Sequence, residues 1–227
     1  MPGRIAACSG HDRYARSRTV GGAAVHPLAR HTHAAMPLLL LGLVLFLGLH
    51  SVRVFAEPWR TRFIEERGPN AWKGLYSVIS LAGFALLVWG YGQARQQPVV
   101  LWQPPVWTRH LAALLTIPAF ICLVAAYVPG NSIKARLHHP MVLGVKVWAL
   151  AHLLATMTLA ASLLCGGFLV WAVLSFRAAR ARDRAAGTVY PPGRLVPTLV
   201  TVVAGLAAWA AFAFWGHGAL IGVRPFG

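Results

Sequence analysis

Two histidines lie in strongly apolar stretches of the sequence. His50 directly follows the run Met36–Leu49, and His152 lies within the run Val142–Thr158. An ionisable side chain inside a membrane is costly unless it has a partner, so it indicates a functional site by default. Two imidazoles on separate helices form a suitable ligand pair for a metal ion or for the iron of a haem. The alternative is that each histidine hydrogen-bonds to a neighbouring helix and has only a structural role.

The composition is typical of a membrane protein. The chain has 227 residues, of which 57% are hydrophobic and 11% are charged, and its mean hydropathy is +0.60. A soluble domain contains about 25% charged residues. The formal net charge of +16 could indicate a nucleic-acid partner, but the basic residues fall mostly between the apolar runs. That placement indicates topology signals that face anionic lipid, and no nucleic-acid partner is expected.

Six apolar segments are candidates for transmembrane helices, since a span needs roughly 17 to 25 mostly apolar residues. The segments are Pro37–Phe55, Leu75–Tyr91, Leu111–Val128, Met141–Ala155, Met157–Phe176 and Leu195–Trp215. The predicted fold class is therefore all-α, a polytopic membrane helical bundle of about six transmembrane helices. The stretch 141–176 leaves two alternatives open, because without a charged loop it forms either one long tilted helix or a tight pair.

The distribution of basic residues favours six spans over five. With six spans, the connections after the first, third and fifth share one side and carry 13 basic residues, against 3 on the other side from Met36 onward. Five spans would give 8 against 8. Basic loops stay in the cytoplasm, so the richer side is predicted to be cytoplasmic. Its residues are Arg53, Arg60, Arg62, Arg67, Lys73, Lys134, Arg136, Lys146, Arg177, Arg180, Arg182, Arg184 and Arg194.

The chain is expected to divide into two parts. Residues 1–35 have the composition of a basic, disordered leader, and the apolar run that begins at Met36 fits a misassigned start. Residues 36–227 are expected to form the transmembrane domain. Within it, the segment Glu57–Lys73 mixes Arg, Glu and Trp after a proline. This pattern predicts a short helix in the membrane interface that ends at Gly68.

Several kinds of chemistry lack the residues they need. The sequence has no HExxH metal motif, no nucleotide-binding glycine loop and no serine–histidine–aspartate order. No carboxylate lies within a predicted span, which argues against proton-coupled transport. Cys8, Cys122 and Cys165 form neither a CxxC nor a CxxCH motif. Neither a disulfide framework nor covalent haem attachment is therefore expected.

The two apolar histidines are predicted to face each other. Counting residues along the predicted helices places His50 and His152 at similar depths in the cytoplasmic half of the bilayer. Arg53 lies one turn beyond His50 and can pair with a haem propionate. The segment Arg136–Pro140 is expected either to be a basic helix start or to contact a substrate or propionate. His217, on the other side of the membrane, is expected to anchor a helix end at the interface.

From Met36 onward the chain resembles the NnrU family of bacterial membrane proteins. It is more distantly similar to the plant and cyanobacterial zeta-carotene isomerases that share this domain. The resemblance covers nearly the whole chain beyond residue 35, and its motifs occur in one order. They are Leu49-His50-Ser51 with Arg53, Arg67-Gly68, Trp72-Lys73-Gly74-Leu75-Tyr76-Ser77, His139-Pro140-Met141 with Gly144, Lys146, Trp148 and Ala151-His152-Leu153, and His217 with Leu220, Gly222 and Val223.

The resemblance implies a haem b protein of the bacterial inner membrane. The isomerases hold haem b between two histidines and use its reduced iron to rotate a cis double bond of a carotenoid. The corresponding ligands here are His50 and His152. The cysteine that takes part in ligand exchange in the isomerases falls near Ala149, which has no thiol. This departure argues against ligand switching.

Three functions follow as expectations from this resemblance. NnrU proteins are associated with nitrite and nitric oxide reduction, which implies a redox role alongside a partner protein. Haem-dependent cis–trans isomerisation of a membrane polyene is the enzymatic alternative. A haem-free accessory protein is the third. Whether the chain is an enzyme stays open at this point.

Overall fold

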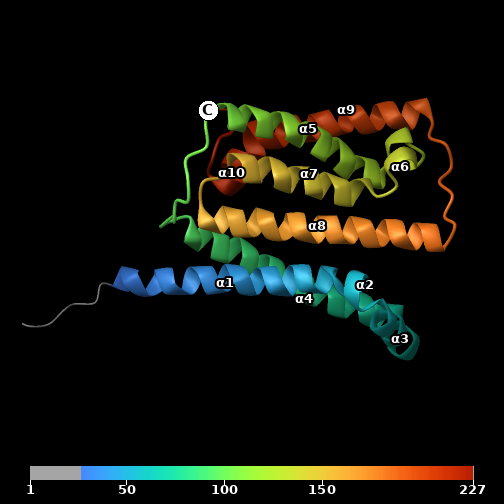
Figure 1. The fold of residues 1–227 in the computed structure, drawn as a ribbon, viewed down its shortest axis with the longest axis horizontal. Coiled ribbons are helices and arrows are strands. Elements are labelled where there is room, and N and C mark those ends of the chain that lie inside the picture. Colours follow the sequence, from blue (N-terminus) through green and yellow to red (C-terminus); the bar gives the residue numbers. More distant parts are fainter. Residues whose placement is uncertain (1–26, 227) are drawn as a thin grey trace, which may run out of the picture.

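The structure is a computed structural model that describes the backbone of residues 27–226 and side chains from Ala35 onward. Figure 1 shows an all-helical bundle, and the described residues contain two isolated β-bridges outside the helices. The expected all-α class is confirmed. The elements are α1 (Pro27–His50), α2 (Val52–Phe55), α3 (Glu57–Arg67), α4 (Pro69–Ala94), α5 (Trp107–Tyr127), α6 (Ser132–Leu137), α7 (Pro140–Ala155), α8 (Leu159–Ala185), α9 (Leu195–Ala211), the π-helical turn η1 (Phe212–Gly216) and α10 (His217–Ile221).

Four stretches of helix are long and apolar enough to cross a membrane. They are α4, α5, α8 and the continuous stretch Leu195–Ile221, which joins α9 to α10. The apolar part of α1 that was searched, Ala35–His50, and the helix α7 are shorter. The membrane character predicted from composition is therefore confirmed with four candidate spans rather than about six. In Figure 1, α1, α4, α5, α7, α8 and α9 run alternately in opposite directions.

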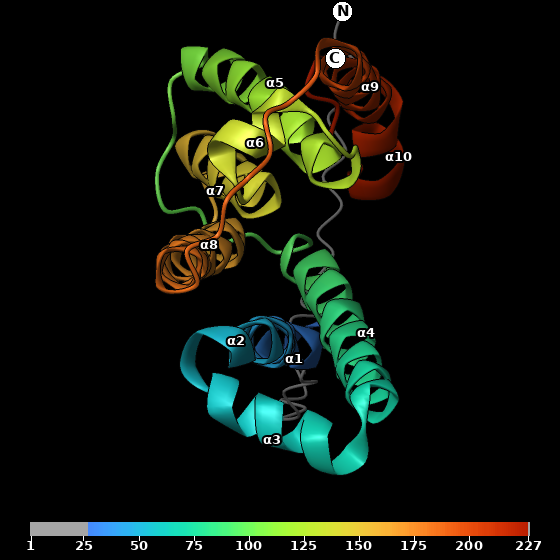
Figure 2. The same cartoon turned by 90° about the vertical axis from the view of Figure 1, so that its right-hand side faces the viewer.

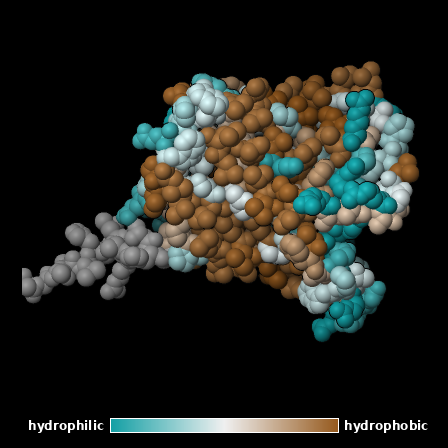
Figure 3. Space-filling model, viewed as in Figure 1, coloured by the Kyte–Doolittle hydropathy of each residue, from teal (hydrophilic) through white to brown (hydrophobic). Residues whose placement is uncertain are grey.

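The two ends of the bundle differ in charge. The helices α2, α3 and α6 and the connection from α8 to α9 lie at one end, which we call the basic end because it carries Arg53, Arg60, Arg182 and Arg184. The connection from α4 to α5 and the helix α10 lie at the opposite end. Figure 3 shows hydrophobic side chains across the middle of the molecule and hydrophilic ones toward the ends. This banding is what an apolar bilayer core requires.

The stretch 141–176 contains two helices, so the alternative of one long tilted helix is wrong. The helix α7 ends at Ala155, and α8 begins after Thr158, whose side chain accepts a hydrogen bond from the Ala161 amide. The turn between them is held by the connection from α4 to α5. Leu101 N donates to Met157 O at 2.8 Å, and Leu159 N donates to Val99 O at 2.9 Å. These bonds satisfy backbone groups that the break in the helix exposes.

A helix is present in the segment Glu57–Lys73, as predicted, and forms α3. It ends at Gly68, whose φ of +83° is a conformation that glycine adopts without strain. The Trp59 and Phe63 rings lie 5.9 and 5.8 Å from the Trp72 ring at the start of α4. The helix α4 begins at Pro69, six residues before the predicted span, because a proline fits the first turn of a helix.

The helices α1 and α4 approach each other closely through glycines. A Cβ atom on Gly42 would lie 2.5 Å from Leu87 N, and one on Gly83 would lie 2.8 Å from Phe46 N. Small residues allow backbones in a membrane to pack at such short range. Figure 2 shows this pair set apart from α5, α7 and α9, with α8 on the side nearer to it. Residues 1–26 of the expected leader lie outside the described residues, and α1 begins at Pro27.

Candidate functional site

His50 is the last residue of α1 and faces α8. Its Nδ1 donates a hydrogen bond to Phe46 O at 2.7 Å. Because a carbonyl oxygen can only accept, the proton is on Nδ1 and the lone pair of Nε2 stays available. The imidazole stacks on the Phe46 ring at 4.2 Å and meets the Trp171 ring edge-on at 6.0 Å. Its orientation is therefore fixed by neighbours on two helices.

His152 lies in the last turn of α7 and is held in the same way. Its Nδ1 donates to Trp148 O at 2.9 Å, which again leaves the Nε2 lone pair available. The Trp148 ring lies 4.9 Å from the imidazole. Both predicted ligand histidines thus present the same nitrogen. A hydrogen bond from Nδ1 to a backbone carbonyl is a frequent companion of metal ligation by the other ring nitrogen.

A continuous series of aromatic rings joins the two histidines. Phe46, which stacks on His50, lies 5.9 Å from Phe168 of α8. Phe168 lies 5.7 Å from Trp148, which in turn packs on His152. Aromatic rings pack favourably at centroid separations of about 4.5 to 7 Å. Phe168 is therefore the central ring of a path from one imidazole to the other.

The structure does not bring His50 and His152 into contact. The helices α1 and α7 are not neighbours, and α8 lies between them. Each histidine lies four residues beyond a ring that packs on Phe168, on helices of opposite direction, so their Cα atoms differ in height by about 12 Å. Their depths match less well than the sequence predicted. Side chains lean toward the N-terminus of their helix, so both imidazoles lean back toward Phe168.

Buried polar atoms without partners lie on the face of α8 near His50. Among the described residues, Trp171 Nε1 and Ser175 Oγ have no hydrogen-bond partner, and Ser175 is only 9% exposed. An unsatisfied buried polar atom costs about 1 to 3 kcal/mol, so its presence points to a missing polar group or water. Trp171 and Ser175 are one turn apart on α8. The side of α8 that meets His50 therefore has unused hydrogen-bonding capacity.

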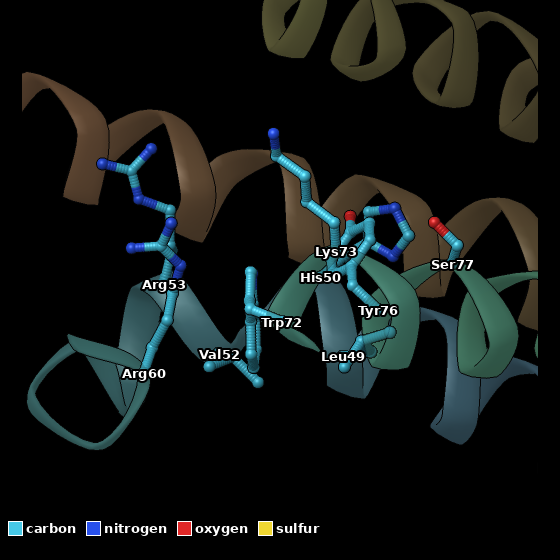
Figure 4. A pocket seen from close by; sticks show the side chains of 9 residues that line it. All are labelled: Leu49, His50, Val52, Arg53, Arg60, Trp72, Lys73, Tyr76 and Ser77. Carbon is cyan, nitrogen blue, oxygen red and sulfur yellow. The ribbon is translucent and has the colours of Figure 1, made fainter. Parts of the chain in front are cut away.

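His50 also lines a cavity of about 280 Å³ at the basic end (Figure 4). The cavity combines apolar walls with three cationic side chains and two hydroxyl groups. Arg53, the predicted propionate partner, lines the same cavity as His50. The lining residues are Leu49, His50, Val52, Arg53, Arg60, Trp72, Lys73, Tyr76 and Ser77.

A single carboxylate offsets the positive charge of this cavity. Glu57 Oε2 lies 3.4 Å from Arg53 Nε, and Glu57 Oε1 lies 3.1 Å from Arg60 Nη1. The Arg60 guanidinium also stands 5.6 Å above the Trp72 ring. Lys73 forms no ion pair with any of the described residues. The cavity therefore carries more positive than negative charge and suits an anionic group.

A second polar cluster forms where α7 begins. His139 Nε2 lies 2.8 Å from Asp183 Oδ2, and Tyr190 donates to the same oxygen at 3.1 Å. His138 stacks on Tyr190 at 4.1 Å and is hydrogen-bonded through Nδ1 to Arg180. Desolvation raises the pKa of Asp183, but its hydrogen bonds to His139 and Tyr190 outweigh this, so the pKa lies below its ordinary value. Of the two predictions for 136–140, a basic helix start fits these contacts.

Two further histidines lie toward the end of the bundle opposite the basic end, and His217 is close enough to His152 for a charge on one imidazole to act on the other. His217 Nδ1 donates to Val223 O at 2.6 Å at the opposite end of the bundle. His110 is exposed near the start of α5. Within the described residues, no group of three or more histidine, cysteine, aspartate or glutamate side chains is arranged to hold a metal ion.

Sequence reasoning missed the residues that surround these histidines. Phe168, Trp171 and Ser175 recur at helical spacing on one face of α8, but this pattern is also that of an ordinary lipid-facing helix. Lys73 and Tyr76 line the cavity beside His50. Both belong to the motif 72–77, which is part of the family resemblance. Membership of this motif was the one sequence feature that could have identified them as site residues. No sequence pattern indicated which side chains they contact.

Comparison with known proteins agrees with the resemblance. Neither the curated proteins nor the solved structures contain a match to this chain. A family model described as "NnrU protein" matches residues 38–225, which include both apolar histidines, the cavity and the cluster at the start of α7. Since the match covers most of the chain, the protein belongs to the NnrU family.

Proposed function

We propose that this protein binds haem b through His50 and His152 and acts in the redox metabolism of nitrite and nitric oxide. The observation that carries the proposal is that both imidazoles present an available Nε2. Each lies on its own apolar helix, and an aromatic cluster separates them. Haem needs neutral imidazoles on opposite faces in a largely apolar pocket.

The residues present fit a porphyrin in three respects. The helices that carry the ligands are separated by α8, and the side chain between the two imidazoles is Phe168 of this helix, so a planar group fits where this ring moves aside. The walls are aromatic, and aromatic rings pack well against a flat macrocycle. The unpartnered Trp171 Nε1 and Ser175 Oγ offer donors beside His50. Binding requires Phe168 to turn from between the imidazoles to one side.

When bound, haem b supplies reversible one-electron chemistry, and the chain sets the conditions for it. His50 and His152 would fix the iron, and their Nδ1 bonds to backbone carbonyls keep them neutral and oriented. The aromatic walls exclude water. Arg53, with Arg60 and Lys73, lines the cavity beside His50, where cations stabilise propionate carboxylates.

The membrane setting completes this proposal. We infer that α1 and α7 cross the bilayer together with the four longer helices, because the six alternate in direction and bring most cations to one end. By the positive-inside rule the basic end then faces the cytoplasm of a bacterial inner membrane. The link to nitrite and nitric oxide follows from the family. A redox partner protein would supply or accept the electron.

The visible spectrum of the purified full-length protein tests haem binding. Protein expressed with ample haem precursor should show a sharp α band on reduction, and both His50→Ala and His152→Ala should lose it. His110→Ala is the matched control, because His110 is exposed and should leave the spectrum unchanged. Circular dichroism shows whether each variant keeps its helices. Colourless wild-type protein, or folded His50→Ala and His152→Ala variants with normal spectra, would overturn the proposal.

Isomerisation of a polyene is the second candidate function. The aromatic series between the two histidines would also accept a flat, conjugated hydrocarbon. Ala149 is fully buried in α7 and carries no thiol, which speaks against ligand exchange with a cysteine at this position. Incubating the reduced protein with a cis-polyene and separating the isomers distinguishes the two functions. Conversion that depends on His152 favours the isomerase.

A further inference from the structure

A basic groove runs along the outer face of α8 at the basic end. It has a volume of about 620 Å³ and is lined by Phe176, Arg177, Ala178, Arg180, Ala181 and Arg184. The groove is separate from the cavity beside His50, since the two share no lining residue. Nothing in the proposed haem chemistry uses these arginines. Their arrangement therefore calls for a ligand of its own.

A fourth cation reaches the groove from the neighbouring helix. Lys146 of α7 places its Nζ atom 5.8 Å from the Phe176 ring, which forms part of the lining. The three arginines of the lining and this lysine thus place four positive charges from two helices in or beside the groove. Within the described part of the chain, no carboxylate lines the groove. This charge is unbalanced, so an anionic ligand would be bound favourably.

The nearby acid is engaged elsewhere. Asp183 lies on α8 next to these arginines, but its Oδ2 is hydrogen-bonded to His139 and Tyr190. Arg180 is held by a hydrogen bond to His138 Nδ1, which requires that nitrogen to be unprotonated. The start of α7 therefore positions one arginine of the groove. The Asp183 carboxylate lies 3.9 Å from the His138 Nδ1 atom that bonds Arg180, so it offsets part of the charge of this arginine. Arg177 and Arg184 form no ion pair with any described residue and keep their positive charge.

The groove continues into an apolar track along the same face of α8. Val170, Leu174, Arg177, Ala181 and Arg184 follow one another at intervals of three or four residues, so they share one side of the helix. Val170 is 61% exposed and Leu174 is 36% exposed. Cations at the end of an exposed apolar track match the two parts of a lipid molecule, the charged headgroup and the acyl chain.

We propose that this groove is a binding site for an anionic phospholipid. Its phosphate lies among Arg177, Arg184 and Lys146, and one acyl chain lies along Leu174 and Val170. Basic pockets at the cytoplasmic ends of membrane helices have the charge that anionic headgroups need. Arginine is suited to this role because its guanidinium binds two phosphate oxygens at once. The site does not depend on haem.

Lipid-dependent thermal stability of the full-length protein tests this site. Phosphatidylglycerol added to detergent-solubilised protein should raise Tm, whereas phosphatidylcholine should not. The double variant Arg177→Gln/Arg184→Gln should bind phosphatidylglycerol about thirty-fold more weakly, since each arginine near the surface contributes about five-fold. Native mass spectrometry counts the lipid that stays bound. Glycerol phosphate, which has no acyl chain, should raise Tm far less.

Two controls keep the result specific. Arg62→Gln/Arg67→Gln removes the same charge from exposed positions of α3 and should bind as the wild type does. Arg177→Lys/Arg184→Lys keeps the charge and should retain part of the affinity. It replaces the glutamine variant as the test if that variant folds poorly. Equal weakening in the α3 control would show diffuse charge attraction and overturn the proposal. An undiminished effect in Arg177→Gln/Arg184→Gln, or an equal response to glycerol phosphate, would overturn it as well.

Discussion

The helix α1 makes two contacts that differ in kind. Against α4 it packs through Gly42 and Gly83, which leave no room for an added Cβ atom. Against α8 it packs through large rings, and the buried Trp171 Nε1 and Ser175 Oγ on that side have no partner. Close backbone packing stabilises a helix pair but leaves no space for a ligand. The glycine contact with α4 therefore provides stability. Room for a ligand lies in the cavity at the basic end, where His50 meets the start of α4, and beside the unpartnered atoms of α8.

The largest effect is expected from Gly83→Leu. A side chain there would meet the Phe46 backbone, whose amide lies 2.8 Å from an ideal Cβ position, so α1 and α4 must separate. Overpacking against a rigid backbone costs about 3 kcal/mol or more, and we expect little folded protein. Yield and Tm are the measurements. Gly74→Leu is the control, because a Cβ atom there meets nothing within 4 Å.

Phe168→Ala should reduce stability less than Gly83→Leu does, and it should also act on haem content. Removing the ring leaves a gap between α1, α7 and α8 and should destabilise the haem-free protein by about 2 to 4 kcal/mol. It should also clear the space between the two imidazoles, so haem content should be kept or should rise. Phe55→Ala, at a 71% exposed position, should change neither. Loss of haem from folded Phe168→Ala would mean that the ring supports the site.

The sequence predicted the two ligand histidines but not the packing of α1 against α4 or against α8. His50 and His152 were found from their apolar surroundings alone, and both lie on the helices expected. The glycine packing was not found, because a helical glycine has no signal until its neighbour is known. The α8 side was missed for a similar reason: the register that places Phe168 between the histidines depends on tertiary packing. The helix α8 also continues beyond Phe176, where the predicted span ends, through arginines that favour helix.

A milder test compares two tryptophans that differ only in their partners. Trp171→Phe removes an indole nitrogen that has no partner, so the stability of the haem-free protein should change by less than about 0.5 kcal/mol or improve. Trp209→Phe removes an indole that donates to Thr116 Oγ1 at 3.0 Å and should cost about 1 kcal/mol. Tm values of both variants provide the comparison. Equal losses would show that Trp171 Nε1 has a partner in solution.

The smallest effect concerns the basic end of α8. The folded-state pKa of Asp183 is lowered, so its bonds to His139 and Tyr190 contribute stability at pH values above the unfolded pKa of about 4. This contribution is lost as the pH falls through the folded pKa. Asp183→Asn should therefore lower Tm slightly at pH 7, and this difference should disappear as the pH falls through the folded-state pKa. A variant that follows the wild-type curve throughout would show that this cluster contributes no stability.

The hydrogen bonds between the two loops at the opposite end of the bundle have a mechanical consequence. Val99 and Leu101 are tied through backbone atoms to the turn between α7 and α8. At the basic end, Arg182 Nη1 donates to Arg53 O at 3.1 Å, and among the described residues this exposed bond is the one hydrogen bond between α8 and α2. If α1 and α8 separate to admit a large flat molecule, the end held by the backbone hydrogen bonds of Val99 and Leu101 should stay closed. The basic end, held by the side-chain bond of Arg182, should open. Entry would then begin beside the arginines and end at the aromatic rings.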